Sequence, residues 1–456
     1  MESIALRGED HYRKDIKKVN VLVVGSGGRE HALLWACSKS RMAGEVYIAP
    51  GNGGTVAHNV DITSENFDAL CKFAREHDCF TVVGQDRPLA NGIVDYFRAR
   101  GLSIFGPTAQ QAWLESSKLY GKQFMKDNGI PTADFETFVD SGAAIRYARS
   151  KDWNVVVKAD GLAEGKGVFV CSSQKEAEAA IISILDAKRF GSAGDRIIVE
   201  DKLYGKELSL FALCDGKDAM YIGSAVDYKR LLDGEKGPNT GSMGAYSPAL
   251  EFDSGLIDRV MRTVVHPAVE KTGFSGFLFV ALMVTEKGPK VLEFNARLGD
   301  PEAQVILPRL KFDLLSEMHS VANGHGIGVK SKDIFNELHA TCVVMASEGY
   351  PFDHKDKLGR AIDGLTEDTS SEGIIVFHAG TRFKDGFLVT DGGRVLDVVG
   401  LDKTPQGSRA KAYGYIERVH FAGEQHRMDI NLEAGKWYLT SAQHRSNVDN
   451  GNRTRT

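Results

Sequence analysis

The sequence has few cysteines, little excess charge and no long hydrophobic run. Its six cysteines are scattered and form no Cys-x-x-Cys pair, which favours reduced, mostly buried thiols. The net charge of -5 gives no reason to expect a nucleic acid or an anionic membrane as partner. The longest apolar run, Phe277 to Val284, is far too short to span a bilayer. Since the polar N-terminal segment lacks the apolar region of a signal peptide, we expect a cytoplasmic protein.

Glycine is the residue type that is over-represented, with 49 copies that cluster in loops between expected strands. A length of 456 residues predicts about two to four domains. The hydrophobic fraction of 42% and the charged fraction of 26% are typical of a globular protein in water. Glycine-rich loops beside strands point to the handling of phosphate groups.

The first folded segment is expected to be a strand, a glycine turn and a helix. Val19–Val24 predicts a buried strand, Gly25–Gly28 the turn, and Arg29–Ser40 the helix. This is the start of a Rossmann-like unit, but the third glycine of a dinucleotide fingerprint falls at Glu30. We therefore expect a phosphate at the helix N-terminus rather than NAD, with Arg29 either as a contact or as a solvated first-turn residue.

A second glycine loop lies between two expected strands. Asn154–Lys158 and Val168–Val170 read as strands around the loop Asp160–Gly167. The spacing of its glycines does not match a Walker A loop, and a strand rather than a helix follows it. The sequence favours a glycine hairpin that folds over phosphates with Lys158 reaching in, although a plain hairpin turn remains the alternative.

The segment Val291 to Gln304 carries the most chemistry. Glu293 and Asn295 lie two residues apart on an expected strand, so both side chains share one face. Their oxygen atoms suit Mg²⁺ rather than Zn²⁺, and Arg297 beside a metal suits a transferring phosphoryl group. The alternative is a half-buried strand whose polar face meets solvent.

Three further segments complete the pattern. A long polar run, Asp233–Pro248, is expected to be a structureless but functional loop. The short link Asp201–Glu207 between two strands is a place where an adenine could sit. On the expected helix Ser117–Asn128, Lys118 and Lys122 share one face, and we expect Lys122 to be solvated.

With these segments assembled, the chain resembles the ATP-grasp superfamily, and more closely its glycinamide ribonucleotide synthetase family. The resemblance runs from about residue 19 to residue 430 and rests on these motifs: GSGGREHA from Gly25, APGNGGT from Ala49, VVKADGLAEGKGV from Val156, GPNTGSMGAYSP from Gly237, EFNARLGDPEAQ from Glu293, HAGT from His378 and GGRVL from Gly392.

The resemblance implies an α/β and α+β architecture with an ATP-grasp fold. The expected parts are an N-terminal extension (1–18), a Rossmann-like parallel-sheet domain (19–119), the ATP-grasp domain (120–330, with its lid at about 133–205), a small C-terminal mixed β/α domain (331–435) and a polar tail (436–456). A monomer is expected.

Enzymes of that family transfer the γ-phosphoryl group of ATP to the carboxylate of glycine. The amine of 5-phosphoribosylamine then attacks the acyl phosphate, which gives glycinamide ribonucleotide, ADP and phosphate in the second step of purine biosynthesis. Such a transfer depends on positioning and on charge stabilisation, supplied by cations and Mg²⁺ or Mn²⁺.

The resemblance also assigns roles to residues. Glu293 and Asn295 would hold the metal, and Arg297, Lys158 and Asp300 would act in catalysis. ATP would contact the following residues: Lys118, Lys158, Gly161, Gly165, Lys166, Gly167, Glu200, Leu203 and Glu207. Phosphoribosylamine would bind Gly27, Gly28, Arg29, Glu30, Asn52, Gly53 and Gly54, and the glycine ammonium would bind Asp300 and Glu302.

The chain departs from the family pattern mainly on the substrate side, at Gln85, Asp86, Val226, Tyr228, Leu298 and Ala303. Leu298 and Ala303 are expected to enlarge the amino acid pocket slightly. An ATP-grasp ligase for another amino acid or amine is therefore one alternative, and a non-catalytic nucleotide-binding relative is another. The complete set of metal and transfer residues argues against the second alternative.

Overall fold

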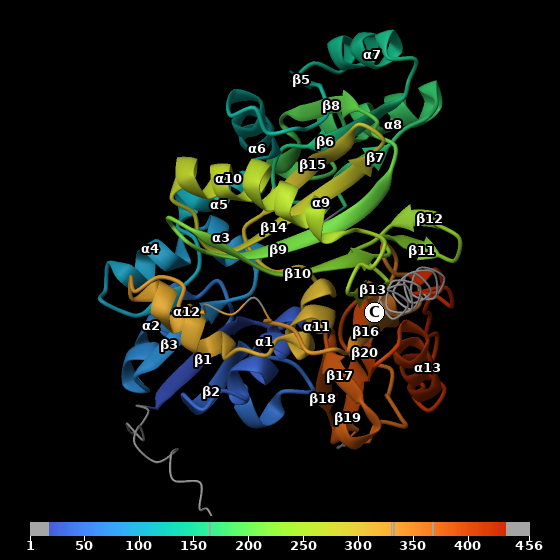
Figure 1. Ribbon diagram of the computed structural model, residues 1–456. Helices are drawn as coiled ribbons and strands as arrows, with labels where there is room; N and C mark the ends of the chain where they lie inside the picture. Colours follow the sequence, from blue (N-terminus) through green and yellow to red (C-terminus); the bar gives the residue numbers. More distant parts are fainter. Residues whose placement is uncertain (1–17, 164–165, 330, 332, 367–368, 435–456) are drawn as a thin grey trace, which may run out of the picture.

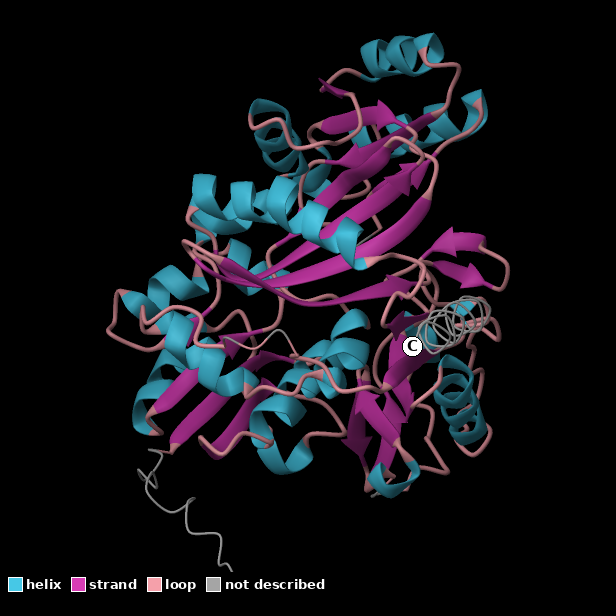
Figure 2. Ribbon diagram, viewed as in Figure 1, coloured by secondary structure: helices cyan, strands magenta, loops and turns pink. Residues whose placement is uncertain are grey.

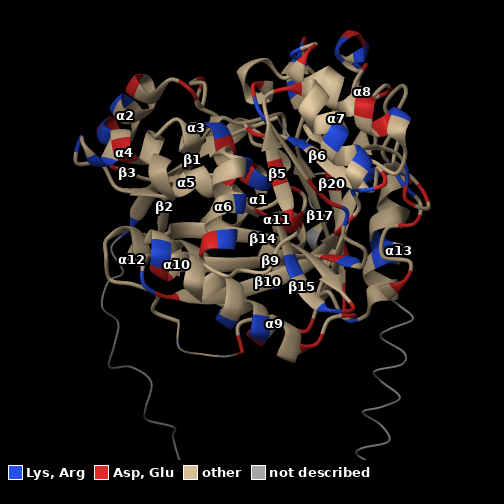
Figure 3. Cartoon of the chain, turned by 90° about the horizontal axis from the view of Figure 1, so that it is seen from above, with Lys and Arg blue, Asp and Glu red and all other residues tan. Residues whose placement is uncertain are grey.

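The computed structural model describes residues 18–163, 166–329, 331, 333–366 and 369–434. The predicted N-terminal extension, the polar tail and Gly165 lie, apart from residue 18, outside the described residues. Helices and strands are mixed along the chain and form several sheets (Figure 2). No helix among the described residues is both long enough and apolar enough to cross a membrane. Acidic and basic residues are interspersed along the chain in Figure 3.

The N-terminal sheet is parallel, as a Rossmann-like unit requires. Its order is β2-β1-β3-β4, with strands β1 (Val19–Gly25), β2 (Ala43–Pro50), β3 (Cys79–Val83) and β4 (Ile104–Phe105). The helices of this part are α1 (Gly28–Ser38), α2 (Phe67–Glu76), α3 (Asp86–Ala90) and α4 (Ile93–Arg98). Parallel strands place the loops after β1, β2 and β3 at one edge, where ligands of such sheets bind.

A second, smaller sheet lies at the top of the molecule in Figure 1. Its order is β5-β8-β6-β7, with β5 (Phe135–Phe138), β6 (Val155–Ala159), β7 (Val168–Val170) and β8 (Ile197–Asp201). Helices α7 (Ser141–Ser150) and α8 (Gln174–Leu185) pack on it through their own apolar cluster. Helices α5 (Ala109–Ser116) and α6 (Lys118–Asp127) lead into this part from the N-terminal sheet.

The largest sheet has eight strands and runs through the middle of the molecule into the C-terminal part. Its order is β15-β14-β9-β10-β13-β16-β20-β17. The strands are β9 (Lys206–Asp215), β10 (Ala219–Asp227), β13 (Gly244–Ser247), β14 (Ser275–Thr285), β15 (Gly288–Asn295), β16 (His339–Ala346), β17 (Ile374–His378) and β20 (Arg394–Asp402). Because β13 pairs with β16, the sheet crosses the predicted boundary at residue 330, and the domain limits stay a prediction.

Helices and hairpins surround that sheet. The helices are α9 (Ser254–Val260), a π-helical segment (Met261–Val265), α10 (His266–Thr272), α11 (Glu302–Ile306), α12 (Leu314–Ala322) and α13 (Pro405–Ile416). The hairpins are β11 (Arg230–Leu232) with β12 (Lys236–Asn239), and β18 (Thr381–Lys384) with β19 (Phe387–Thr390). Short 3-10 turns cover Val56–His58, Gly191–Gly194, Leu307–Arg309, Lys355–Lys357 and Ser370–Glu372.

The predicted structureless loop at Asp233–Pro248 is wrong. This segment contains strand β12 and strand β13, and β13 is an interior strand of the large sheet. The sequence hid them because β12 contains Gly237 and Pro238, residue types that are rare in strand interiors, and because β13 is only four residues long and begins at Gly244. Helix α3 begins at Asp86, directly after β3, and Gly92, with φ of 83°, separates it from α4.

Candidate active site

Strand β15 at the edge of the large sheet carries the two predicted metal ligands. Glu293 pairs with Ala281 of β14, and Asn295 ends the strand opposite Phe279. The Glu293 carboxylate accepts a hydrogen bond from Lys118 Nζ at 2.8 Å. Burial raises the pKa of Glu293, but the charges of Lys118 and Lys158 outweigh it and hold that pKa well below its usual range. Glu293 is therefore an anionic oxygen donor at neutral pH.

Asn295 presents an amide oxygen beside that carboxylate. It is 5% exposed, its Oδ1 accepts a hydrogen bond from Arg297 Nη2 at 3.2 Å, and its Nδ2 is buried without a hydrogen-bond partner. No cluster of three or more His, Cys, Asp or Glu side chains suited to a metal ion occurs among the described residues. One carboxylate and one amide oxygen fit Mg²⁺, which commonly takes its remaining ligands from water and substrate phosphates.

Two lysines meet one buried carboxylate beneath β15. Glu200, at the end of β8, lies 2.5 Å from both Lys122 Nζ and Lys158 Nζ. Lys158 also donates to the Leu292 carbonyl at 3.2 Å, which ties it to β15. Two positive charges outweigh burial and lower the pKa of Glu200, so the carboxylate is ionised.

The prediction that Lys122 is solvated is wrong. Its side chain is 3% exposed, and burial lowers the pKa of Lys122 to about 8 in spite of Glu200. It also donates to Thr132 Oγ1 at 2.7 Å. Lys118 and Lys122 do share a helix face, but that face of α6 lies against the two strands instead of water. A cavity lined by Lys118, Lys122, Lys158 and Glu293 marks the place where the two sheets meet.

Asp160 attaches the glycine loop to helix α6. Its Oδ1 accepts hydrogen bonds from Ser117 Oγ and from the Leu119 backbone N–H, both at 2.9 Å. Its Oδ2 accepts from Arg196 Nη2 at 2.9 Å. Gly161 continues against Ala193, since a Cβ on Gly161 would come within 2.8 Å of the Ala193 Cβ. An open cavity of about 800 Å³ lies along Asp160, Gly161, Ala193 and Arg196.

The remaining predicted ATP contacts among the described residues are Lys166, Gly167, Leu203 and Glu207. Lys166 and Gly167 lead from the loop into β7, where the Gly167 carbonyl accepts from the Ala159 N–H at 2.9 Å. Leu203 is half-buried, and Glu207 accepts a hydrogen bond from Lys229 Nζ at 3.0 Å. Leu203 and Glu207 line neither of the two cavities described above.

Arg297 is held in one orientation by a carboxylate that the sequence did not reveal. Its Nη2 lies 2.8 Å from Glu115 Oε1, and its Nη1 donates to the Leu298 carbonyl at 3.0 Å. Glu115 also accepts from the Ala296 N–H at 2.8 Å, so α5 positions the end of β15. Nothing in the spacing of Glu115 distinguishes it from an exposed helix residue, which is why sequence reasoning missed it.

Asp300 faces the glycine turn before α1. A Cβ on Gly27 would lie 3.3 Å from Asp300 Oδ2, so the two segments lie close together and glycine leaves room between them. Arg394 Nη1 lies 3.3 Å from Asp300 Oδ1 and donates to the Asp300 carbonyl at 2.7 Å. Burial raises the pKa of Asp300, but Arg394 and Arg29 outweigh it and lower that pKa. Asp300, the predicted catalytic carboxylate, therefore lies beside Gly27, which is predicted to bind phosphoribosylamine.

The rest of the predicted substrate set lies around that turn. Glu30 turns back onto the helix start, where it accepts from the Gly27 N–H at 2.8 Å and pairs with Arg29 at 2.5 Å. Asn52 donates to the carbonyls of Ser26 at 2.9 Å and His378 at 2.7 Å. Gly53 and Gly54 pack against Thr381 and His378 of the C-terminal part. Glu302 is buried on the other side and accepts from Ser209 Oγ at 3.0 Å.

Leu298 and Ala303 do not enlarge a substrate pocket. Both belong to an apolar core cluster, with exposures of 1% and 0%. Of the other departures, Asp86 lies near Arg297 and Arg29, whose charges outweigh burial and lower its pKa. Tyr228 packs on the C-terminal part, where its hydroxyl accepts from the Asn431 N–H at 3.0 Å. Asp86 therefore lies within electrostatic reach of Arg297, the predicted catalytic cation.

Three family models match consecutive parts of the chain. The N domain of phosphoribosylglycinamide synthetase matches residues 19–115, its ATP-grasp (A) domain residues 116–303, and its C domain residues 340–433. Together they cover most of the chain in the order expected from the sequence.

Individual relatives agree with these models. The phosphoribosylamine–glycine ligase of Ralstonia nicotianae is 47% identical over 427 residues, which are 91% of this chain and 99% of that protein. The trifunctional purine biosynthetic protein adenosine-3 of Gallus gallus is 44% identical over 425 residues, which are 91% of this chain and 42% of that protein.

Solved structures confirm the fold. The phosphoribosylamine–glycine ligase of Thermotoga maritima has a TM-score of 0.78 at 34% identity and covers 90% of this chain and 100% of that chain. A biotin carboxylase domain from Hydrogenobacter thermophilus, in complex with MgADP and bicarbonate, has a TM-score of 0.69 at 17% identity, over 89% and 91% of the two chains. The matches confirm an ATP-grasp fold, and the chain belongs to the phosphoribosylglycinamide synthetase family of ATP-dependent ligases.

Proposed function

We propose that this protein joins glycine to 5-phosphoribosylamine at the expense of ATP, in the second step of purine biosynthesis. The products would be glycinamide ribonucleotide, ADP and phosphate. The observation that carries the proposal is the meeting of Lys118, Lys158, Glu293, Asn295 and Arg297 where the small lid sheet faces β15. Positive groups beside hard oxygen ligands suit phosphoryl transfer, which needs positioning and charge stabilisation but no covalent nucleophile.

In this proposal, Lys118 and Lys158 contact the phosphates of ATP beneath the loop that begins at Asp160. Both side chains are anchored, because Lys118 pairs with Glu293 and Lys158 with Glu200. Glu293 and Asn295 would hold Mg²⁺ or Mn²⁺, which neutralises phosphate charge when it is bound. Since the two side chains supply only two ligands, the phosphates of ATP would supply others.

Arg297 would stabilise the negative charge of the acyl phosphate formed from glycine and ATP. Its contacts with Glu115, Asn295 and the Leu298 carbonyl fix the guanidinium, so little reorganisation is needed when charge develops. The ionised Asp300 carboxylate would receive the glycine ammonium, and the Gly27–Gly28 turn would lie against phosphoribosylamine. The contact between Gly27 and Asp300 supports this arrangement, because it brings the two substrates together.

The six cysteines, all buried and unbridged, favour a reducing compartment such as the cytoplasm for this reaction.

The decisive experiment measures ADP release with ATP and Mg²⁺ in the presence of glycine, with and without phosphoribosylamine. We expect sustained turnover only when both substrates are present, and a product with the mass of glycinamide ribonucleotide. Turnover with another amino acid or amine at a higher kcat/KM would assign the protein a changed specificity instead.

A further inference from the structure

Asp397 is a buried carboxylic acid for which the proposed reaction has no role. It lies on β20, opposite Phe377 of β17 and Val344 of β16, and is 0% exposed. Its Oδ2 touches the first residue of α1 so closely that a Cβ on Gly28 would come within 1.8 Å. The C-terminal part thus places a carboxyl group directly against the glycine turn of the proposed substrate site.

Gln304 of α11 joins this carboxyl group to Asp300. Its Nε2 donates to Asp300 Oδ1 at 2.8 Å and to Asp397 Oδ2 at 2.9 Å. A primary amide has two N–H groups, so both of its donors are used. Gln304 Oε1 and Asp397 Oδ1 are then buried atoms without a hydrogen-bond partner. If Asp397 were ionised, both of these atoms would be acceptors, and neither could satisfy the other.

A proton on Asp397 Oδ1 would give a hydrogen bond to both unpaired atoms, Asp397 Oδ1 and Gln304 Oε1. The acid O–H would donate to Gln304 Oε1 while Gln304 Nε2 donates to Asp397 Oδ2, which is the paired arrangement of a carboxylic acid with a primary amide. Buried polar groups are nearly always hydrogen-bonded, so the neutral acid fits this site better than the carboxylate.

The surrounding charges favour the same state. Asp300 brings negative charge to Asp397 from the segment before α11. The Cys342 thiol faces Asp397 from β16, and the charges of Asp300 and Glu302 also act on that thiol. Arg394 is a cation whose charge lowers the pKa of Asp397, but it already donates to the carbonyls of Gly241 and Asp300, each at 2.7 Å. Arg29 on α1 acts on Asp300. Burial, followed by the charge of Asp300, raises the pKa of Asp397 to about 7.

We propose that Asp397 is a positioning residue that works as a neutral acid: it donates to Gln304 Oε1, so that Gln304 holds Asp300 and no second negative charge faces the Gly27–Gly28 turn. Its ionisation would leave Gln304 Oε1 without a donor and place a negative charge beside the N-terminus of α1, where the phosphate of phosphoribosylamine would approach. The kinetic part of this inference rests on the proposed function, whereas the protonation of Asp397 does not.

The first experiment reads the protonation state of Asp397 directly in the ligand-free protein. The variant Asp397→Asn keeps both hydrogen bonds to Gln304 but cannot ionise, and Asp402→Asn on the same strand is the matched control. Infrared difference spectra at pH 6 should show a protonated carboxyl band in the wild type and in Asp402→Asn, and this band should be missing in Asp397→Asn. A carboxylate band in its place would overturn the proposal. Because burial also raises the pKa of Asp227, to about 8, the wild-type infrared titration cannot be assigned to Asp397 by itself, and the pH dependence of the assigned ¹³C signal of the Asp397 carboxyl group decides the question if the variant does not fold.

The second experiment follows the KM for phosphoribosylamine against pH. The ratio of the wild-type KM to the Asp397→Asn KM cancels the titration of the substrate itself. For a group with a pKa near 7 whose ionised form does not bind, that ratio should rise roughly fivefold between pH 7 and pH 8. If the ratio of the two KM values did not change with pH while the infrared band showed Asp397 to be protonated, the positioning role would be overturned. Absence of any ligation in the wild type, with the band present, would contradict the proposed function and not the acid–amide pair.

Discussion

At the scale of single residues, the candidate site is a set of balanced charges. Lys118 is paired with Glu293, Arg297 with Glu115, and Glu200 with two lysines. Each pair is at least partly withdrawn from water, so each partner controls the orientation and the ionisation of the other. The groups that would meet ATP are therefore oriented before ATP binds, which is what electrostatic catalysis requires.

Glu293 is the residue whose replacement tests this arrangement most directly. The variant Glu293→Gln keeps the size of the side chain but removes the charge that would hold the metal. We expect kcat to fall roughly a hundredfold, because one electrostatic contact of this kind is typically worth ~3 kcal/mol. Steady-state ADP release over a range of Mg²⁺ concentrations measures the effect.

The exposed Glu286, on the turn between β14 and β15, provides the matched control. Glu286→Gln makes the same chemical change on the same hairpin, and its kcat should equal that of the wild type. If Glu293→Gln turned over at the wild-type rate at ordinary Mg²⁺, the assignment of Glu293 to the metal would have to be abandoned.

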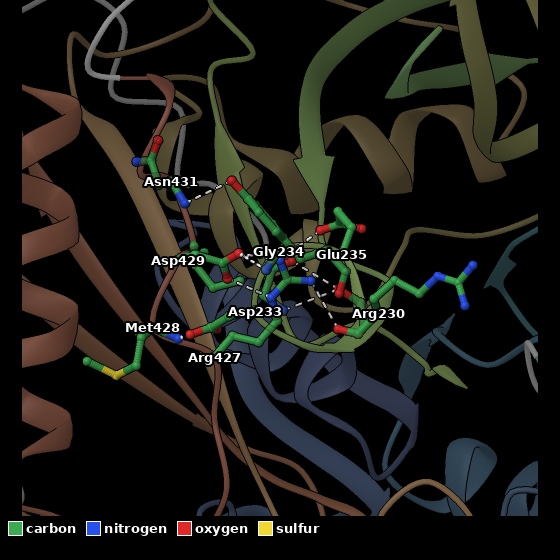
Figure 4. Close-up of polar contacts among 12 residues, drawn as sticks. Arg230, Asp233, Gly234, Glu235, Arg427, Met428, Asp429 and Asn431 are labelled. Atoms are coloured by element: carbon green, nitrogen blue, oxygen red, sulfur yellow. Dashed lines mark hydrogen bonds and ion pairs between the residues drawn. The ribbon is translucent and has the colours of Figure 1, made fainter. Parts of the chain in front are cut away.

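At the scale of elements, the hairpin β11–β12 shows how a polar segment becomes ordered. Arg427, 1% exposed, reaches the hairpin from the C-terminal part (Figure 4). Its guanidinium lies 2.7 Å from Glu235 and from Asp429, and it donates to the Arg230 carbonyl at 3.0 Å. Its guanidinium carbon also lies 4.7 Å from the centre of the Tyr228 ring. One buried cation thus links the hairpin β11–β12 with the segment that follows α13.

Replacing Arg427 should loosen this hairpin. In Arg427→Met the apolar stem is kept, but Asp429 and the Arg230 carbonyl lose the guanidinium donor, and Asp429 keeps only the Gly234 N–H of the contacts described. Breaking a buried pair by removing one partner typically costs about 3 to 5 kcal/mol, and the exposure of Glu235 places the expected loss near 3 kcal/mol. Thermal unfolding and the rate of proteolysis at Lys236 measure it.

Arg418, which is half-exposed and paired with Glu372, is the control for the same substitution. Arg418→Met should change the unfolding temperature little, since exposed ion pairs contribute at most about 1 kcal/mol. Equal effects of the two variants would show that Arg427 acts as an ordinary surface charge.

The elements also show what a sequence can reveal. The strand Val19–Val24 and the helix over Ser117–Asn128 were predictable because their apolar patterns are local. Glu293, Asn295 and Lys158 could be singled out because polar groups on a strand beside a glycine loop are unusual. The roles of Lys122, Glu115 and Asp397 depend on partners far away in the chain, so no local pattern could separate them from solvated side chains. The strand β13 was hidden for the same reason, because pairing with β16 outweighs its weak propensity.

At the scale of the whole molecule, the N-terminal sheet and the C-terminal part are joined across the substrate side of the site. Helix α1 packs on β17, where the His378 N–H donates to His31 Nδ1 at 3.0 Å. The His31 ring also lies 5.5 Å from the ring of Phe377, between centroids. Because Asn52 and Gly53 bond to His378 and Thr381 at the same place, this contact fixes how the glycine turn faces Asp300.

This contact should make the protein sensitive to acid. Burial, with a further contribution from His378, lowers the pKa of His31 to about 3, and burial lowers that of His378 to about 4. In the unfolded chain a histidine has a pKa of about 6.5. The unfolded chain therefore binds more protons below pH 6.5, and stability falls as the pH is lowered toward 3, by up to about 1.4 kcal/mol per pH unit for each histidine.

The variant His31→Asn isolates the contribution of His31, since its amide oxygen can still accept from the His378 N–H but cannot be protonated. Between pH 6.5 and pH 5 the wild type should lose about 2 kcal/mol more than the variant. Urea unfolding at both pH values measures the difference, and His325→Asn, at an exposed position, should behave as the wild type does. If His31→Asn lost as much stability in acid as the wild type, His31 would have to be solvated, and the joint between α1 and β17 would have to be looser than the hydrogen bond to His31 Nδ1 implies.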